Sequence, residues 1–259
     1  MTRVIKIGGR PQSDPTLGAL LAGSWNNGCH GALVLVHGGG DEVSTLQAAI
    51  GSTARFVDGR RVTSAQDIDL IRMALSGSAN KRLVANLVRN GIDAVGFSGE
   101  DASLIAASPI DTERLGYVGV PERVNVRLLH HLLAGGYLPV VSPVSLDATA
   151  TLGSALNVNA DDAAAAIAVA LQAQELLLVA DVPGVLHDGA LLPALTSSEA
   201  DALLAQGIAS GGMRAKLQAA VSALAGGVHR VRISDLAAIS DALRGTVLIR
   251  GEESRRGGT

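Results

Sequence analysis

The sequence has little cysteine, few aromatic residues and no strong net charge, and each shortage excludes a class of protein. A single cysteine, Cys29, rules out an internal disulfide and fits a reducing compartment. Aromatic residues make up only 2% of the chain, which disfavours stacking on exposed bases as the main mode of binding. The net charge of −3 provides no general attraction to nucleic acid or to an anionic membrane.

Long apolar runs are also missing. The longest, from Ala163 to Leu171, is too short to cross a bilayer, and the first residues do not form a secretory n-region. We therefore expect a soluble intracellular protein, placed in the cytoplasm, with no nucleic-acid or membrane partner.

Lysine is scarce as well, and its three positions are informative. Of the 21 basic residues, the lysines are Lys6, Lys81 and Lys216, and all others are arginine. Lys6 precedes Gly8-Gly9 and Lys216 follows Gly211-Gly212. A compact ammonium beside bare backbone favours contact with a phosphoryl group, a role for which a planar guanidinium is not equivalent. Lys81 receives no role beyond a helix surface.

Short β-branched or Leu/Val runs alternate with longer helical patterns along most of the chain. The expected strands cover residues 4–7, 32–36, 94–97, 138–141, 176–180 and 230–233. The expected helices cover residues 16–24, 41–50, 65–76, 78–90, 125–134, 161–171, 197–206, 213–225 and 236–243. This alternation predicts an α/β three-layer sandwich, with a mostly parallel central sheet and helices on both faces.

Two segments interrupt the alternation. Within 55–63 and 109–120, Asp58-Gly59 and Leu115-Gly116-Tyr117 are typical of β-hairpins, which we expect to form a lid over the open end of the sheet. Linker candidates lie at 147–153 and 188–192. The first would divide the chain into an N-terminal lobe, 1–150, and a C-terminal lobe, 151–259.

Glycine clusters follow the first two expected strands, as Gly8-Gly9 and as His37-Gly38-Gly39-Gly40 directly before a helix. Glycine lets backbone N–H groups approach an anion, and a helix N-terminus adds a favourable dipole. Ligands of open α/β sheets bind at these carboxyl ends. Each cluster alone is equally consistent with a tight turn, but two at successive strand ends predict a phosphate site. Neither a Walker-type loop nor a dinucleotide fingerprint is present.

A third group of polar residues is Asn157-Val158-Asn159-Ala160-Asp161-Asp162, ahead of an alanine-rich helix. Helix capping explains one or two of them but not both asparagines, which point the same way if the chain is extended. A carboxylate here can hold lysine ammonium groups in place. We assign that role to Asp161, although the pattern alone does not distinguish it from Asp162.

Taken together, the motifs resemble the acetylglutamate kinases of the amino-acid kinase family over about residues 3 to 249. The resemblance rests on Lys6-Ile7-Gly8-Gly9, His37-Gly38-Gly39-Gly40, Asp58-Gly59-Arg60-Arg61-Val62-Thr63, Asn157-Val158-Asn159-Ala160-Asp161, Asp181-Val182-Pro183-Gly184-Val185-Leu186 and Gly211-Gly212-Met213-Arg214-Ala215-Lys216.

The resemblance implies that ATP with Mg²⁺ phosphorylates the side-chain carboxylate of N-acetyl-L-glutamate, the second step of arginine biosynthesis, giving N-acetyl-L-glutamyl 5-phosphate and ADP. Lys6 and Lys216 would stabilise charge on the phosphoryl group and on ADP, and Asp161 would orient both. The N-terminal lobe would bind the acyl amino acid and dimerise, and the C-terminal lobe would bind ATP.

The resemblance also implies the binding residues. Those for the substrate are Gly39, Gly40, Arg61, Asn157 and Asn159. Those for the nucleotide are Gly8, Asp181, Val182, Pro183, Gly184, Val185, Leu186, Ile208, Ala209 and Ser210. No residue is assigned to a metal. Relatives inhibited by arginine carry an additional N-terminal helix, so a first strand near Val4 leads us to expect a homodimer insensitive to arginine.

Two residues depart from the family pattern, and two other functions remain open. Arg10 and Arg214 stand where the family has a small and an apolar residue. With Arg60 and Arg61 they would suit a kinase that acts on aminoadipate attached to an acidic carrier protein. The other alternative, a catalytically silent amino-acid sensor of the same fold, would not need Lys6, Lys216 and Asp161.

Overall fold

The computed structural model describes residues 2–57, 59–149 and 155–251, so Asp58 and part of the expected 147–153 linker lie outside the described residues. The sheet strands are β1 Arg3–Ile7, β2 Leu33–His37, β5 Ala94–Gly99, β6 Ile105–Pro109, β7 Val118–Val124, β8 Leu138–Asp147, β9 Ala155–Val158, β10 Glu175–Val179, β13 Ala194–Thr196, β14 Arg230–Ser234 and β15 Thr246–Ile249. Two small hairpins pair β3 Phe56–Val57 with β4 Arg60–Arg61, and β11 Leu186–His187 with β12 Ala190–Leu191.

The α-helices are α1 Leu17–Ser24, α2 Gly40–Ala49, α3 Ala65–Ile71, α4 Asn80–Arg89, α5 Val126–Ala134, α6 Ala160–Ala170, α7 Ser197–Ala205 and α8 Gly211–Ala225. Shorter helical segments are η1 Arg10–Ser13, η2 Trp25–Cys29, η3 Arg72–Ala79, η4 Asp101–Ser103 and η5 Leu236–Ile239. Among the described residues, no helix is both long enough and apolar enough to cross a membrane.

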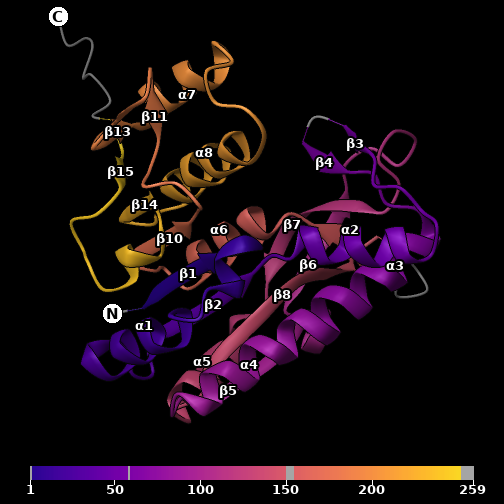
Figure 1. Cartoon of the computed structure of the whole chain (residues 1–259), viewed down its shortest axis with the longest axis horizontal. Helices are drawn as coiled ribbons and strands as arrows, with labels where there is room; N and C mark the ends of the chain where they lie inside the picture. The colour runs from indigo at the N-terminus through magenta and orange to yellow at the C-terminus, as the bar shows by residue number, and fades with distance from the viewer. Residues whose placement is uncertain (1, 58, 150–154, 252–259) are drawn as a thin grey trace, which may run out of the picture.

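The main sheet confirms the predicted α/β sandwich (Figure 1). Its 11 strands run in the order β13-β15-β14-β10-β1-β2-β8-β6-β7-β9, with β5 beside β8. β1 lies between β2 and β10, parallel to both, so the chain leaves β1 toward one side of the sheet and later returns to the other. Such a reversal of strand order opens a crevice at the carboxyl ends of the strands.

Successive side chains of β1 point to opposite faces of the sheet, so they pack against different layers of helices. Ile5 and Ile7 pack with leucines of α1 and α4 on one face. Val4 packs on the opposite face with the buried alanines of α6 and α8. Because successive strand residues point to opposite faces, Lys6 lies on the side of α6 and α8.

The β3–β4 hairpin is tied to the turn between β6 and β7. The Thr63 N–H donates to the carbonyl O of Leu115 at 2.9 Å, and the Tyr117 N–H donates to the carbonyl O of Thr63 at 2.8 Å. Gly116 has φ +69°, and a Cβ there would collide with the Thr63 carbonyl O. The two predicted hairpins therefore form one lid-like structure, with the second extending over Ile105–Val124.

Three predictions about the elements were wrong. The expected helix 236–243 ends after the single turn of η5, because arginine side chains take carbonyl O atoms that a longer helix would use: Arg232 Nη2 donates to Ala238 O, and Arg3 Nη1 donates to Ile239 O. The expected linker at 188–192 belongs to the β11–β12 hairpin, with Gly189 at φ +78° in its turn. The separate helices 65–76 and 78–90 form one continuous helical run through η3.

Candidate active site

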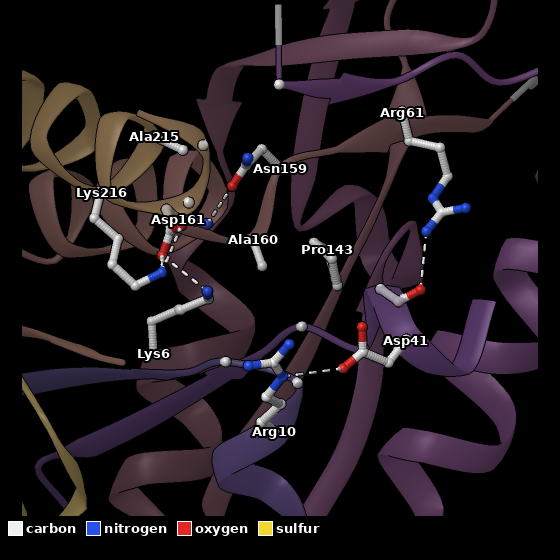
Figure 2. Close-up of a pocket in the computed structure, with 18 of the residues that line it drawn as sticks. Lys6, Arg10, Asp41, Arg61, Pro143, Asn159, Ala160, Asp161, Ala215 and Lys216 are labelled. Atoms are coloured by element: carbon white, nitrogen blue, oxygen red, sulfur yellow. Dashed lines mark hydrogen bonds and ion pairs between the residues drawn. The ribbon is translucent and has the colours of Figure 1, made fainter. Parts of the chain in front are cut away.

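The crevice at the carboxyl ends of β1, β2 and β10 holds a cleft of about 1020 Å³. The first turns of α2, α6 and α8 and the β3–β4 hairpin complete its walls. Figure 2 shows Lys6, Lys216 and Asp161 together at one end of this cleft and Arg61 at the other. The structure therefore brings together residues that lie up to 210 positions apart in the sequence, from Lys6 to Lys216.

Asp161 accepts hydrogen bonds from both cleft lysines. Its Oδ1 lies 2.9 Å from Lys6 Nζ, and its Oδ2 lies 3.2 Å from Lys216 Nζ. All three residues are buried, with exposed fractions of 3% for Asp161, 5% for Lys6 and 8% for Lys216. The predicted choice of Asp161 over Asp162 agrees with this geometry, because Asp162 contacts Arg60 instead.

Strand alternation and helix capping position the three charged groups. Strand alternation directs Lys6 toward α6, as described above. Asn159 caps α6 by accepting a hydrogen bond from the Asp161 N–H at 2.8 Å, which sets the first turn that carries Asp161. Lys216 extends from the second turn of α8.

For Lys6 and for Asp161, burial and the neighbouring opposite charge shift the pKa in opposite directions. Burial disfavours the charged form of Lys6, and so does the like charge of Lys216. Together these two effects exceed the opposing effect of Asp161, so the pKa of Lys6 is lowered to about 8. Burial also opposes ionisation of Asp161, but the two ammonium groups outweigh it and hold the pKa of Asp161 below its ordinary value. One carboxylate between two ammonium groups leaves one positive charge in excess, which suits an anionic ligand.

The two glycine clusters line the cleft between its ends. Gly8, Gly9, Gly38, Gly39 and Gly40 all contribute to its wall. Gly39 has φ +150°, and a Cβ there would lie 2.7 Å from Leu75 Cδ2, so a side chain does not fit. The first turn of α2 follows at once, with its unpaired N–H groups at the cleft.

Arg61 lies at the far end of the cleft, held by α2. Its Nη1 donates to Gln47 Oε1 at 2.5 Å, and its Nη2 donates to the Gly40 carbonyl O at 2.9 Å and to Ser44 Oγ at 2.8 Å. Of its five N–H donors, Nε–H and one on Nη1 have no partner among the described residues. Ser44 and Gln47 were not predicted from the sequence, since a polar residue on a helix surface carries no such signal.

Both asparagines of the predicted pair line the cleft. Asn157 Nδ2 donates to Thr63 Oγ1 at 3.0 Å, which links β9 to the segment after the β3–β4 hairpin. Asn159 serves as the cap of α6, so its Oδ1 is already in use.

The residues predicted for the nucleotide divide into two groups. Gly8, Asp181, Val182 and Leu186 line the cleft. Pro183, Gly184, Val185, Ile208, Ala209 and Ser210 do not. Of the second group, Val185 and Ala209 are buried in the core, and their assignment to the nucleotide stays a prediction.

Arginines outside the predicted site have partners that the sequence did not indicate. Arg60 Nη2 lies 3.0 Å from Asp162 Oδ2, joining the β3–β4 hairpin to α6. Burial raises the pKa of Asp162 despite this arginine. Arg10, 77% exposed in its side chain, lies 3.1 Å from Asp181 and 3.9 Å from Asp41 at the mouth of the cleft. Lys81 Nζ donates to the Gly96 carbonyl O at 2.6 Å, away from the cleft.

Comparison with known proteins agrees with this geometry. Residues 1–235 match the model of the amino acid kinase family. The chain belongs to the amino-acid kinase family. It is 45% identical over 254 residues to the acetylglutamate kinase of Chloroflexus aurantiacus, covering 97% of this chain and 98% of that protein. Membership in a kinase family implies ATP as the phosphoryl donor.

Solved structures show the same fold. The protein smu.665 of Streptococcus mutans superposes with a TM-score of 0.85 at 30% identity, covering 96% of this chain and 99% of that one. Carbamate kinase of Giardia lamblia, solved with AMP-PNP, has a TM-score of 0.73 at 18% identity, with 96% and 98% covered. At that identity the second likeness concerns the fold alone.

The charge balance around Lys6 generates a prediction about pH. Because Lys6 loses its proton as pH rises through about 8, its side-chain resonance should titrate near that value. Replacing Asp161 by Asn removes the group that raises the Lys6 pKa, so the midpoint should fall further. NMR of protein labelled at lysine ¹³Cε measures this directly, since the chain has only three lysines and Lys81 serves as the internal reference. An unchanged or higher midpoint in Asp161→Asn would contradict the coupling.

Proposed function

We propose that this protein transfers the γ-phosphoryl group of MgATP to the side-chain carboxylate of N-acetyl-L-glutamate. The products are N-acetyl-L-glutamyl 5-phosphate and ADP, as in the second step of arginine biosynthesis. The observation that carries the proposal is the Lys6–Asp161–Lys216 group at the end of a glycine-walled cleft. The 45% identity to an acetylglutamate kinase over nearly the full length of both chains supports the choice of acceptor.

The two ammonium groups suit the charge that develops in phosphoryl transfer. As the acceptor oxygen bonds to the γ-phosphorus and the bond to the β–γ bridging oxygen breaks, negative charge grows on the leaving ADP oxygen and remains on the phosphoryl oxygens. Lys6 and Lys216 would stabilise this charge, and Asp161 would keep them a fixed distance apart. Mg²⁺ enters with ATP as part of the substrate, bound mainly by the phosphates.

The acceptor carboxylate needs no general base. A side-chain carboxyl of this kind is ionised at neutral pH. Catalysis then consists of positioning and charge stabilisation, and the fully buried His37 is not required as a base. Burial lowers the pKa of His37 to about 4, so the ring is neutral under working conditions.

The far end of the cleft suits the α-carboxylate of the acceptor. Among the described residues, two N–H donors of Arg61 have no partner there, and Asn157 lies in the same wall. In this proposal the N-terminal lobe, residues 1–150, holds the acyl amino acid, and the C-terminal lobe, residues 151–259, holds ATP. A basic entrance for an acidic carrier protein is less well supported, because Arg60 is paired with Asp162 and Arg10 with two aspartates.

The first prediction from the proposed function concerns the acceptor. N-acetyl-L-glutamate should be the preferred substrate, and free glutamate should have a kcat/KM roughly 10²-fold lower, because its ammonium must be desolvated beside Arg61. ADP release with MgATP and a panel of N-acetylglutamate, N-succinylglutamate, N-acetylaminoadipate, glutamate, aspartate and carbamate measures the ranking. Equal turnover of glutamate and its acetylated form would overturn the assignment.

A second prediction concerns the lysines. If compact ammonium groups fit between glycine backbone and phosphoryl oxygens, Lys6→Arg and Lys216→Arg should each lower kcat by about 10²- to 10³-fold, or about 3 to 4 kcal/mol, although charge is preserved. Lys81→Arg is the matched control and should be nearly silent, since a guanidinium can also donate to the Gly96 carbonyl. Normal turnover with both cleft variants would refute their catalytic role, and thermal melting checks that each variant is folded.

We also propose that the protein acts as a homodimer in the cytoplasm. Two large apolar side chains of the η3–α4 run, Met73 and Val88, are 59% and 53% exposed, which makes this run the candidate interface. Sedimentation equilibrium should give about twice the chain mass of 26.2 kDa. A monomer at micromolar concentration would contradict the proposal.

A further inference from the structure

Gln12, a residue of η1 for which neither the sequence nor the family match gave a role, connects the two glycine loops. Its Nε2 donates to the carbonyl O of Gly8 at 3.2 Å and to the carbonyl O of Gly38 at 2.9 Å. One side-chain amide therefore ties the loop after β1 to the loop after β2. Gln12 itself does not line the cleft, whereas Gly8 and Gly38 do.

The Gly38 carbonyl has a second donor on the same inner side. The His37 ring is fully buried, and its Nε2 lies 3.1 Å from Asn80 Nδ2, which also donates to the Val140 carbonyl O at 3.0 Å. Because the Asn80 amide donates to Nε2, that nitrogen is unprotonated, and the ring proton is on Nδ1. Nδ1–H then donates to the Gly38 carbonyl O at 2.8 Å.

A hydrogen bond that fixes the direction of a carbonyl group also fixes the direction of the N–H group in the same peptide plane. The described chain contains no cis peptide bond, and in a trans peptide the C=O and the following N–H point in opposite directions. Gln12 thus fixes the Gly9 N–H through Gly8, and with His37 it fixes the Gly39 N–H through Gly38. Neither amide donates to another group among the described residues, and both glycines line the cleft.

We propose that Gln12 is a positioning residue for phosphoryl transfer: together with His37, it directs the N–H groups of Gly9 and Gly39 toward the oxygens of the transferring phosphoryl group. This inference rests on the proposed kinase function. Fixed backbone donors are most effective where charge develops in the transition state, because they do not have to reorient as the reaction proceeds. Loss of Gln12 would free the Gly8–Gly9 peptide plane to rotate and leave the Gly38–Gly39 plane held by His37 alone, with every cation in the cleft still in place.

The test uses two variants of Gln12, which is partly exposed and so can be changed without opening the core. Gln12→Met keeps the length of the side chain but loses both donors, and Gln12→Glu replaces the donors by carboxylate oxygens that repel the two carbonyls. Since losing one transition-state donor outright costs about 10²- to 10³-fold, we expect an indirect loss of about 10- to 10²-fold in kcat for Met and a larger loss for Glu. KM for ATP should change less than about 2-fold, because the cations that attract the phosphates remain. Gln206→Met, at an exposed position at the end of α7, is the matched control.

Binding of MgADP with aluminium fluoride in the presence of N-acetyl-L-glutamate, measured by calorimetry, provides a second readout. It should weaken in Gln12→Met by the same factor as kcat, while binding of MgADP alone stays unchanged. A purely structural tie would instead lower the melting temperature and leave the kcat of the folded enzyme intact, which would overturn the proposal. Failure of the wild-type protein to phosphorylate any acceptor in the panel would overturn the proposed function itself, and this inference with it.

Discussion

The carboxylate of Asp161 between two buried ammonium groups is the interaction on which the rest of the cleft depends. Without it, Lys6 and Lys216 would repel each other in a space from which water is largely excluded, and burial would favour loss of the Lys6 proton. With it, the group keeps one positive charge in excess at the base of the cleft. A buried charge of this kind is costly unless a partner of opposite sign arrives, so the site is arranged for an anion before any ligand binds.

The helices that carry this group must approach closely, and their composition allows it. The buried alanines of α6 and α8 leave room for the two helices to pack near one another, α6 against β1 and α8 against β10 and β14. A larger side chain where α6 and α8 meet would push α8 outward, and Lys216 would move with it. The alanine-rich segment looks like an ordinary apolar run in the sequence, but its small side chains help to position the site.

Much of this architecture could be predicted from local sequence, because the signals are local. The apolar strands β1, β2 and β10, each followed by glycine or a polar turn, indicate both the sheet and the edge where ligands bind. The order of the motifs indicates the family. The strands β9, β13 and β15 were not predicted, because runs of three or four residues are too short to show a strand period of their own.

Contacts between segments that lie far apart in the sequence could not be predicted either. Arg60 and Asp162 are 102 positions apart, and nothing in either segment indicates the other. The length of the last expected helix was wrong because Arg232 and Arg3, both on strands, donate to the carbonyl groups of Ala238 and Ile239 that a longer helix would have used. The choice between Asp161 and Asp162 required the direction of each side chain in the first turn of α6, which residue types alone do not specify.

The lysine-carboxylate group has a further chemical consequence if the product is an acyl phosphate. Such a mixed anhydride is an acylating agent, and it would form next to two primary amines. An amine attacks a carbonyl carbon only through its lone pair, which protonation removes. Asp161 opposes the effect of burial on the Lys6 pKa, and in doing so it lowers the fraction of Lys6 that is free to be acylated by the product.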